Sequence, residues 1–118
     1  MVLLHQNVYF VLKLIPQGKV SSYGAVASMA GYPGYARHVG KLLSNLPNDS
    51  TLPWFRVLNS QGKISLKGSD LERQKHLLIQ DGIEVSDTGR VSLKKYLWRP
   101  EETPQIDHFK TSKLSSAN

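Results

Sequence analysis

Residues 21–46 read SSYGAVASMAGYPGYARHVGKLLSNL, and this stretch indicates two short helices joined by a tight turn. The serines at its start can cap a helix over residues 23–30, because a serine oxygen accepts a hydrogen bond from a free N–H of the first helical turn. Gly31 suits the left-handed conformation that often ends a helix. Residues 32–34, Tyr-Pro-Gly, are typical of a turn. The pattern predicts a helix-turn-helix.

The second helix of this motif is predicted over residues 35–46. Its apolar positions follow the i, i+3, i+4, i+7 spacing of one buried face; they are Val39, Leu42, Leu43 and Leu46. The other face is small, polar and basic, with Arg37 and Lys41 and no acidic residue. Such a face suits a DNA groove, because its cations can meet phosphates. Taken alone, the motif also fits a helical hairpin that only packs against the core.

We predict an N-terminal helix before this motif and a loop after it. A helix is predicted to begin at Asn7, which can cap it, and to end at residues 16–18, Pro-Gln-Gly. Its inward positions at helical spacing are Val8, Val11, Leu12 and Ile15. Residues 47–53, PNDSTLP, read as a loop.

The second half of the chain predicts short strands around one further helix. Residues 54–66 read as two strands of a hairpin that turns at Asn59-Ser-Gln-Gly62. Residues 69–72, Ser-Asp-Leu-Glu, form a capping box that opens a helix ending at Gln80 or Asp81. Residues 83–85 and 90–93 are expected to pair as edge strands. The fold class is therefore mainly α with a small β-hairpin.

Composition and charge indicate one basic folded body followed by a tail. Residues 1–100 hold 13 Lys and Arg against six Asp and Glu, whereas residues 101–118 are polar, nearly neutral and without periodicity. We predict a domain over 1–100 and a flexible tail over 101–118. The positive charge suits a polyanion partner, and simple solubility is the alternative. No apolar run could span a membrane and no signal peptide is visible, so an intracellular location is expected.

Residues that commonly carry catalysis do not form a recognisable set. Cysteine is absent, which removes thiol nucleophiles and thiolate metal sites. The four histidines, at positions 5, 38, 76 and 108, are too scattered for a metal site. No glycine-rich phosphate loop or nucleophile elbow is present. Neither a metal nor another cofactor is expected, and binding is favoured over catalysis.

Four stretches together resemble one protein family. VSSYGAVASMAG, YARHVGKLL, PWFRVLNSQGKIS and ERQKHLLIQDGIEV are similar, in order and spacing, to the DNA-binding domain of the O6-alkylguanine-DNA alkyltransferases. They resemble still more closely the alkyltransferase-like proteins, in which Trp replaces the reactive Cys. The likeness covers about residues 5–100. It implies a winged helix-turn-helix-like DNA-binding domain of the alkyltransferase type.

The enzyme's Pro-Cys-His-Arg-Val box reads Pro53-Trp54-Phe55-Arg56-Val57 here. The resemblance places Trp54 where the alkyl-accepting thiolate would be, and an indole cannot replace a thiolate as nucleophile. Phe55 stands where the enzyme has the histidine that relays the proton, and Asp81 stands where the relay has Glu. The resemblance therefore implies no enzymatic alkyl transfer, while the lesion pocket is retained.

Further roles come from the resemblance residue by residue. Tyr23 matches a tyrosine that helps expel the target nucleotide, and Arg37 matches the arginine finger that fills the gap left in the duplex. The expected DNA- and lesion-binding residues are Ser22, Tyr23, Arg37, Lys41, Trp54, Val57, Lys67 and Ser69. Pro53, Phe55, Arg56 and Asn59 are expected to support the site structurally.

These residues predict a monomeric, non-enzymatic DNA damage sensor. It would bind double-stranded DNA that contains O6-alkylguanine, flip the damaged base into its pocket, and hold it without removing the alkyl group. The resemblance suggests that nucleotide-excision repair proteins then read the complex. The alternatives are a helix-turn-helix regulator that reads a DNA sequence, an active transferase, and a protein-interaction module.

Overall fold

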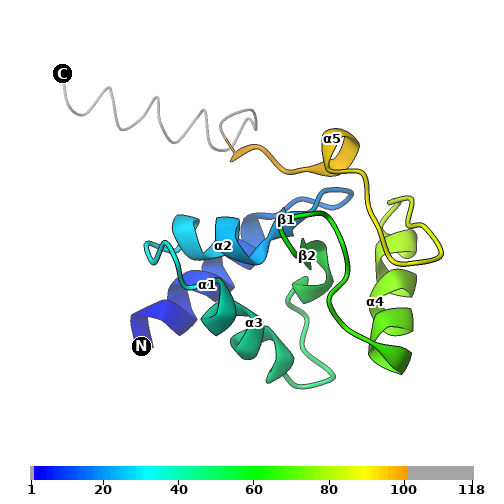
Figure 1. The fold of residues 1–118 in the computed structure, drawn as a ribbon. Helices are drawn as coiled ribbons and strands as arrows, with labels where there is room; N and C mark the ends of the chain where they lie inside the picture. Colours follow the sequence, from blue (N-terminus) through cyan, green and yellow to red (C-terminus); the bar gives the residue numbers. More distant parts are fainter. Residues whose placement is uncertain (1, 101–118) are drawn as a thin grey trace.

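The computed structural model describes residues 2–100, and these form a helical body with a very small sheet (Figure 1). In chain order the elements are α1 (Val2–Leu14), β1 (Ser21–Ser22), α2 (Tyr23–Met29), α3 (Ala36–Ser44), the 3₁₀ helix η1 (Trp54–Arg56), β2 (Val57–Leu58), α4 (Gly68–Gln80) and α5 (Leu93–Tyr96). The predicted tail, residues 101–118, lies outside the described residues. No helix within residues 2–100 is long and apolar enough to cross a membrane.

Helix α1 starts at Val2, so the prediction that it begins at Asn7 is wrong. The apolar spacing continues backwards from Val8 to Leu4, which is 1% exposed, and burial of this extra turn extends the helix. Asn7 instead lies within the helix, and its Nδ2 donates a hydrogen bond to the Ala30 carbonyl at 2.9 Å. The side chain thus ties α1 to the end of α2.

The predicted helix-turn-helix is confirmed in α2 and α3. The Ser22 Oγ accepts a hydrogen bond from the Ala25 N–H at 3.1 Å, as expected for a cap. Gly31 takes a φ of +91°, which a glycine adopts without steric cost. The inward residues of both helices are buried; they are Val26, Ala27, Val39 and Leu43. Helix α3 is shorter at both ends than the predicted span of 35–46.

The predicted hairpin over residues 54–66 does not form. Trp54–Arg56 is a 3₁₀ turn, and the two-residue strand β2 pairs in parallel with β1, Ser21 opposite Val57. Val57 and Leu58 are both fully buried, which a strand between two core layers allows and an exposed hairpin does not. The turn at Asn59–Gly62 is present, with the Gly62 N–H bonded to the Asn59 carbonyl at 3.0 Å.

The chain after this turn pairs with a later segment instead of returning along β2. The Ile64 N–H donates to the Gly89 carbonyl at 2.9 Å, and the Val91 N–H donates to the Gly62 carbonyl at 2.8 Å. The predicted pairing of residues 83–85 with 90–93 is therefore wrong. Leu93 already belongs to α5, which Ser92 caps by accepting a hydrogen bond from the Lys95 N–H.

The prediction that residues 69–72 form a capping box is also wrong, because the helix starts before Ser69. Helix α4 begins at Gly68, its cap position is Lys67, and no side chain caps it. Ser69 lies in the first turn of the helix and is exposed. The predicted end at Gln80 or Asp81 is confirmed, because Gln80 is the last helical residue and Asp81 is the C-cap.

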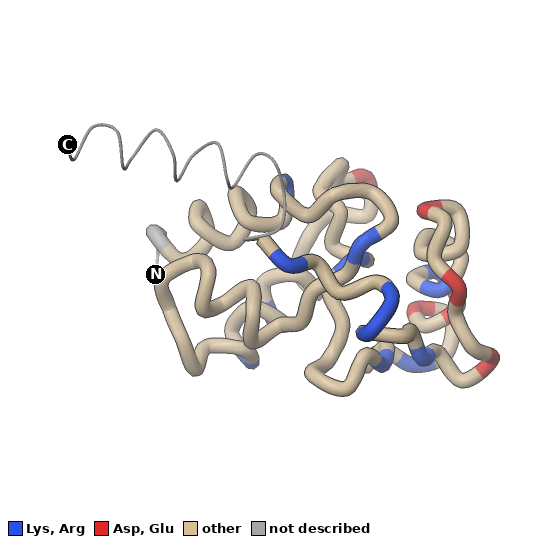
Figure 2. Tube along the Cα trace, turned by 90° about the horizontal axis from the view of Figure 1, so that it is seen from above, with Lys and Arg blue, Asp and Glu red and all other residues tan. Residues whose placement is uncertain are grey.

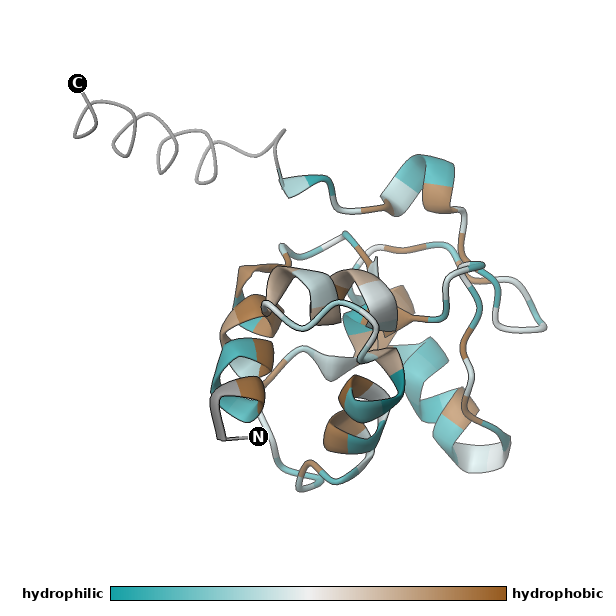
Figure 3. Cartoon of the chain, turned by 60° about the vertical axis from the view of Figure 1, so that its left-hand side comes forward, coloured by the Kyte–Doolittle hydropathy of each residue, from teal (hydrophilic) through white to brown (hydrophobic). Residues whose placement is uncertain are grey.

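Two clusters of buried residues form the core. The larger lies among α1, α2 and α3, and the smaller lies beneath α4 and α5. Apolar positions are accordingly denser on α1 than on α4 in Figure 3. Trp98, 5% exposed, closes the larger cluster, and its backbone N–H donates to the Val20 carbonyl at 2.8 Å. This layout sets α3 and α4 on either side of η1.

Candidate nucleic-acid interface

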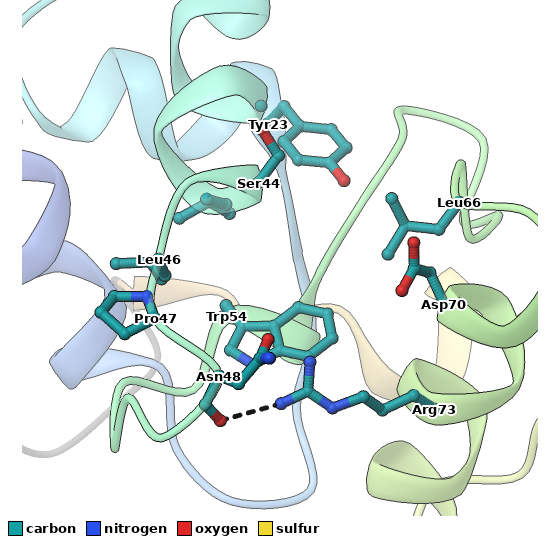
Figure 4. Close-up of a pocket in the computed structure, with 11 residues that line it drawn as sticks. Tyr23, Ser44, Leu46, Pro47, Asn48, Trp54, Leu66, Asp70 and Arg73 are labelled. Carbon is teal, nitrogen blue, oxygen red and sulfur yellow. Dashed lines mark hydrogen bonds between the residues drawn. The ribbon is translucent and has the colours of Figure 1, made fainter.

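A pocket of about 150 Å³ lies between α2 and α3 on one side and η1 and α4 on the other. Its polar and aromatic walls come from Tyr23, Ser44, Asn48, Trp54, Asp70 and Arg73, and glycine, leucine and proline residues complete it (Figure 4). A closed apolar cavity of about this size holds a benzene ring. The pocket therefore has room for an aromatic ring, and it is partly open to solvent.

Trp54 forms one wall because η1 turns its half-buried indole towards the pocket. The backbone N–H of Trp54 donates to the Leu52 carbonyl at 2.8 Å, and the backbone N–H of Arg56 donates to the Pro53 carbonyl at 3.1 Å, which shapes the 3₁₀ turn. The Phe55 ring meets the indole edge-on, 6.1 Å between centroids. The structural role expected of Pro53 and Phe55 stays a prediction.

Arg56 anchors η1 to two other parts of the fold. Its Nε and Nη2 donate to both carboxylate oxygens of Asp81 at 2.8 and 2.7 Å, and its Nη1 donates to the Ile15 carbonyl at 2.9 Å. The same carboxylate accepts a hydrogen bond from the Gly18 N–H at 3.0 Å. These bonds tie η1 to the end of α4 and to the segment after α1. Asp81 is occupied as the partner of a guanidinium, not of a proton-relaying ring.

Gln74, on α4, also holds the segment that contains η1 and the start of β2. It is 1% exposed, and its Nε2 donates to the Phe55 carbonyl at 3.0 Å and to the Val57 carbonyl at 3.1 Å. Val57 is fully buried beneath the pocket and does not line it. Val57 is one of the expected lesion-binding residues, but its carbonyl already accepts a hydrogen bond from Gln74.

Tyr23 forms the opposite wall at the start of α2. Its hydroxyl lies 3.1 Å from the Ser65 Oγ, and its ring lies beside Gly40, where a Cβ would come within 3.8 Å. Figure 4 shows Tyr23 and Trp54 on two sides of one space, with Leu66 and Asp70 on a third. The structure thus brings together two aromatic residues that are 31 positions apart in the sequence.

The exposed face of α3 carries the cations that the sequence predicts. Arg37 and Lys41 are both exposed, and within residues 2–100 neither side chain has a hydrogen-bond or ion-pair partner. The ring of His38 packs on Tyr35 beside them, 4.7 Å between centroids. Acidic positions gather towards the end of the molecule that carries α4, away from α1 to α3 (Figure 2).

The remaining predicted binding residues lie outside the pocket. Lys67 and Asn59 line a separate hollow together with Lys63. Asn59, which was expected to be structural, also accepts hydrogen bonds at its Oδ1 from two backbone N–H groups of its own turn, at 2.9 and 3.0 Å. Ser69 is exposed on α4, and the Ser22 hydroxyl is used as the cap of α2.

The sequence patterns did not indicate four polar residues of the pocket, namely Ser44, Asn48, Asp70 and Arg73. Arg73 extends from α4 over the Trp54 ring, 5.2 Å from its centroid, and its Nη2 donates to the Asn48 carbonyl at 3.1 Å. Asp70 and Arg73 are three residues apart and so share one face of α4. That spacing was visible in the sequence, but nothing in it indicated which element the face would meet.

The site offers binding surfaces without an obvious reactive group. The chain has no cysteine, and Trp54 and Phe55 occupy two successive positions of the box. Within residues 2–100 no group of three or more His, Asp and Glu side chains could hold a metal ion. The residues that line the pocket can make aromatic contacts, hydrogen bonds and charge interactions.

Known proteins are similar to this chain in sequence and in fold. The family model of the 6-O-methylguanine DNA methyltransferase DNA-binding domain matches residues 3–83. A Vibrio parahaemolyticus protein named DNA base-flipping protein is 66% identical over 94 residues, 80% of this chain and 94% of that one. An Escherichia coli protein of the same name is 48% identical over 93 residues, 79% of this chain and 72% of that one.

The fold also matches a solved protein–DNA complex. The crystal structure of Schizosaccharomyces pombe Atl1 in complex with damaged DNA containing O6-carboxymethylguanine superposes with a TM-score of 0.78 at 38% identity, covering 85% of this chain and 98% of that one. The resemblance noted in the sequence is thereby confirmed. On this match and on the family model, the chain belongs to the family of the 6-O-methylguanine DNA methyltransferase DNA-binding domain.

Proposed function

We propose that this protein is a non-enzymatic DNA damage sensor. It binds double-stranded DNA, turns O6-alkylguanine out of the helix, and holds the base in the pocket between Tyr23 and Trp54. The observation that carries the proposal is the position of this pocket, with aromatic residues on two walls, beside the exposed cations of α3. Relatives named DNA base-flipping protein, and Atl1 bound to damaged DNA, support the same reading.

The energetics of base flipping suit the groups present. Extruding a base costs a few kcal/mol of stacking and pairing. Stacking of a base on an aromatic side chain recovers about 1–3 kcal/mol, and a planar guanidinium placed in the vacated stack offsets part of the rest. Trp54 and Tyr23 supply the first contribution and Arg37 supplies the second. Lys41 adds a phosphate contact that does not depend on sequence.

No alkyl transfer is part of the proposed function. Transfer would require a nucleophile that forms a stable bond to the alkyl carbon and releases guanine. A chain without cysteine, with an indole and a phenyl ring at successive box positions, provides neither the thiolate nor the base to generate it. We further propose that the protein acts as an intracellular monomer, and that nucleotide-excision repair proteins recognise its complex with the lesion.

The test is a titration of two matched duplexes, with and without one O6-methylguanine, at two salt concentrations. We expect tighter binding of the damaged duplex and weaker binding of both at higher salt. Arg37→Ala should weaken both complexes and reduce the preference for the lesion, because the gap in the duplex is no longer filled. Equal affinity of the wild-type protein for the two duplexes would disprove the sensor.

Two controls separate this function from the alternatives. A helix-turn-helix regulator would bind as a dimer and prefer particular DNA sequences, so light scattering and duplexes of shuffled sequence distinguish it. An active transferase would acquire label from DNA that carries an isotopically labelled methyl group. We expect a monomer, no dependence on the flanking sequence, and no labelled protein.

A further inference from the structure

Arg73 joins three parts of the pocket wall. Its side chain extends from α4, its guanidinium lies over the Trp54 ring at 5.2 Å, and its Nη2 donates to the Asn48 carbonyl at 3.1 Å (Figure 4). The contacts span a helix, a loop and the 3₁₀ turn. An arginine has five N–H donors, so one hydrogen bond to a carbonyl leaves most of them for a ligand.

The charge of Arg73 is not neutralised by an acid. Within residues 2–100, Arg56 pairs with Asp81 and Lys95 pairs with Glu84, whereas Arg73 has no carboxylate partner. Asp70 lines the same pocket from the turn before Arg73 on α4. In Figure 4 it lies near Leu66, whereas the guanidinium lies beside Trp54 and Asn48. The pocket thus has a positive and a negative side.

We infer that Arg73 selects the chemical class of the adduct, so that the pocket favours O6-alkyl groups that end in a carboxylate over neutral groups of the same size. The inference rests on the proposed function, because it assumes that the flipped base enters this pocket. A base against Trp54 brings its substituent next to the guanidinium that covers the same indole. A carboxylate there accepts charge-assisted hydrogen bonds in the fork geometry that arginine offers.

The size of the effect follows from the strength of such bonds. A charge-assisted hydrogen bond is stronger than a neutral one, but water competes for the exposed Arg73 side chain. We therefore expect a preference of about tenfold, which corresponds to about 1.4 kcal/mol. Asp70 opposes part of this preference, because it places a like charge in the same pocket. Neutralising Arg73 should therefore lower the preference for the carboxylate adduct, whereas neutralising Asp70 should raise it.

The experiment compares duplexes that contain O6-carboxymethylguanine or its neutral amide, O6-carbamoylmethylguanine, with undamaged DNA as reference. The measured quantity is the ratio of the affinities for the two adducts. Arg73→Gln should bring this ratio close to one, Arg73→Lys should retain part of it, and Asp70→Asn should raise it. Lys75→Ala removes the same charge from the same helix outside the pocket, and it should leave the ratio unchanged.

The outcomes separate the inference from the proposed function. A wild-type ratio near one, with both adducts still bound more tightly than undamaged DNA, overturns the role of Arg73 and leaves the sensor intact. A ratio that Arg73→Gln and Asp70→Asn do not change also overturns it. Equal binding of all three duplexes defeats the proposed function itself. Because Asp70→Asn needs no change at Arg73, the inference remains testable even if Arg73→Gln fails to fold.

Discussion

At the scale of single residues, two ion pairs illustrate how burial determines the contribution of a contact to the stability of the fold. Arg56 and Asp81 have side chains only 16% and 7% exposed, and their guanidinium and carboxylate form two parallel hydrogen bonds. Lys95 and Glu84 meet at 2.9 Å with side chains 60% and 79% exposed. The first pair joins η1 to the end of α4, whereas water competes for the second.

Arg56→Ala should destabilise the protein strongly. It leaves the buried Asp81 carboxylate without its main partner and the Ile15 carbonyl without its donor. Removal of one member of a buried pair costs about 3–5 kcal/mol, which urea unfolding can measure. If Arg56→Ala loses less than about 1 kcal/mol, Arg56 is not the anchor of η1.

Glu84→Gln is the matched control for that experiment. A hydrogen bond from Lys95 lowers the pKa of Glu84, so the contribution of this carboxylate is present at neutral pH and is lost as the pH falls through the lowered value. Because the pair is exposed, we expect Glu84→Gln to leave the unfolding midpoint at neutral pH almost unchanged.

At the scale of elements, the chain after β2 follows a path that depends on one glycine. Gly62 has a φ of +79°, and a Cβ there would lie 2.7 Å from the Val91 carbonyl oxygen and 2.9 Å from the Leu93 side chain. The turn at residues 59–62 and the segment at 89–93 can therefore meet only where no side chain intervenes. This contact supports the loop that leads into α4.

Gly62→Ala should therefore be more damaging than an alanine at another glycine with positive φ. Gly82 has a φ of +92°, but a Cβ added there would meet nothing within 4 Å, so Gly82→Ala carries backbone strain alone, about 1–2 kcal/mol. Gly62→Ala adds a clash with backbone to similar strain. Thermal unfolding of the two variants should rank Gly62→Ala as the less stable. The opposite order would mean that the 89–93 segment moves aside at little cost.

At the scale of the whole molecule, charge is arranged along the body. Helices α1 and α3 carry Lys and Arg without acids and α2 carries no charged residue, whereas α4 and the turn that follows it hold both signs (Figure 2). Helix α3 lies on the opposite side of the body from α5 (Figure 1). A polyanion should therefore bind along α3, and the lysines of α5 should contribute little.

Lys41→Ala tests this arrangement. It should reduce the slope of log Kd against log salt by about one, because one phosphate contact is lost. The preference for damaged over undamaged DNA should not change, because Lys41 does not line the pocket. Lys94→Ala, on α5, removes the same charge and should leave the slope as it is. If both variants lower the slope equally, DNA binding is not confined to α3, and if Lys41→Ala leaves the slope unchanged, α3 is not the DNA-binding face.

Local sequence rules predicted the elements whose stability is local. The cap at Ser22, the glycine after α2 and the apolar stripe of α3 all act within a few residues, and all are present in the structure. The motifs of the box and of the two helices likewise led to the right family. The predicted start of α1 is wrong because burial of Leu4 outweighs the capping tendency of Asn7.

The sequence by itself determined the helix-turn-helix and the basic face of α3, because each is a matter of residue type at short spacing. Only the tertiary structure decided that β2 pairs in parallel with β1, and that Arg73 lies over Trp54. Both depend on contacts between residues far apart in the chain. No local pattern specifies such contacts, since they form when the two core clusters pack and bring α4 against η1.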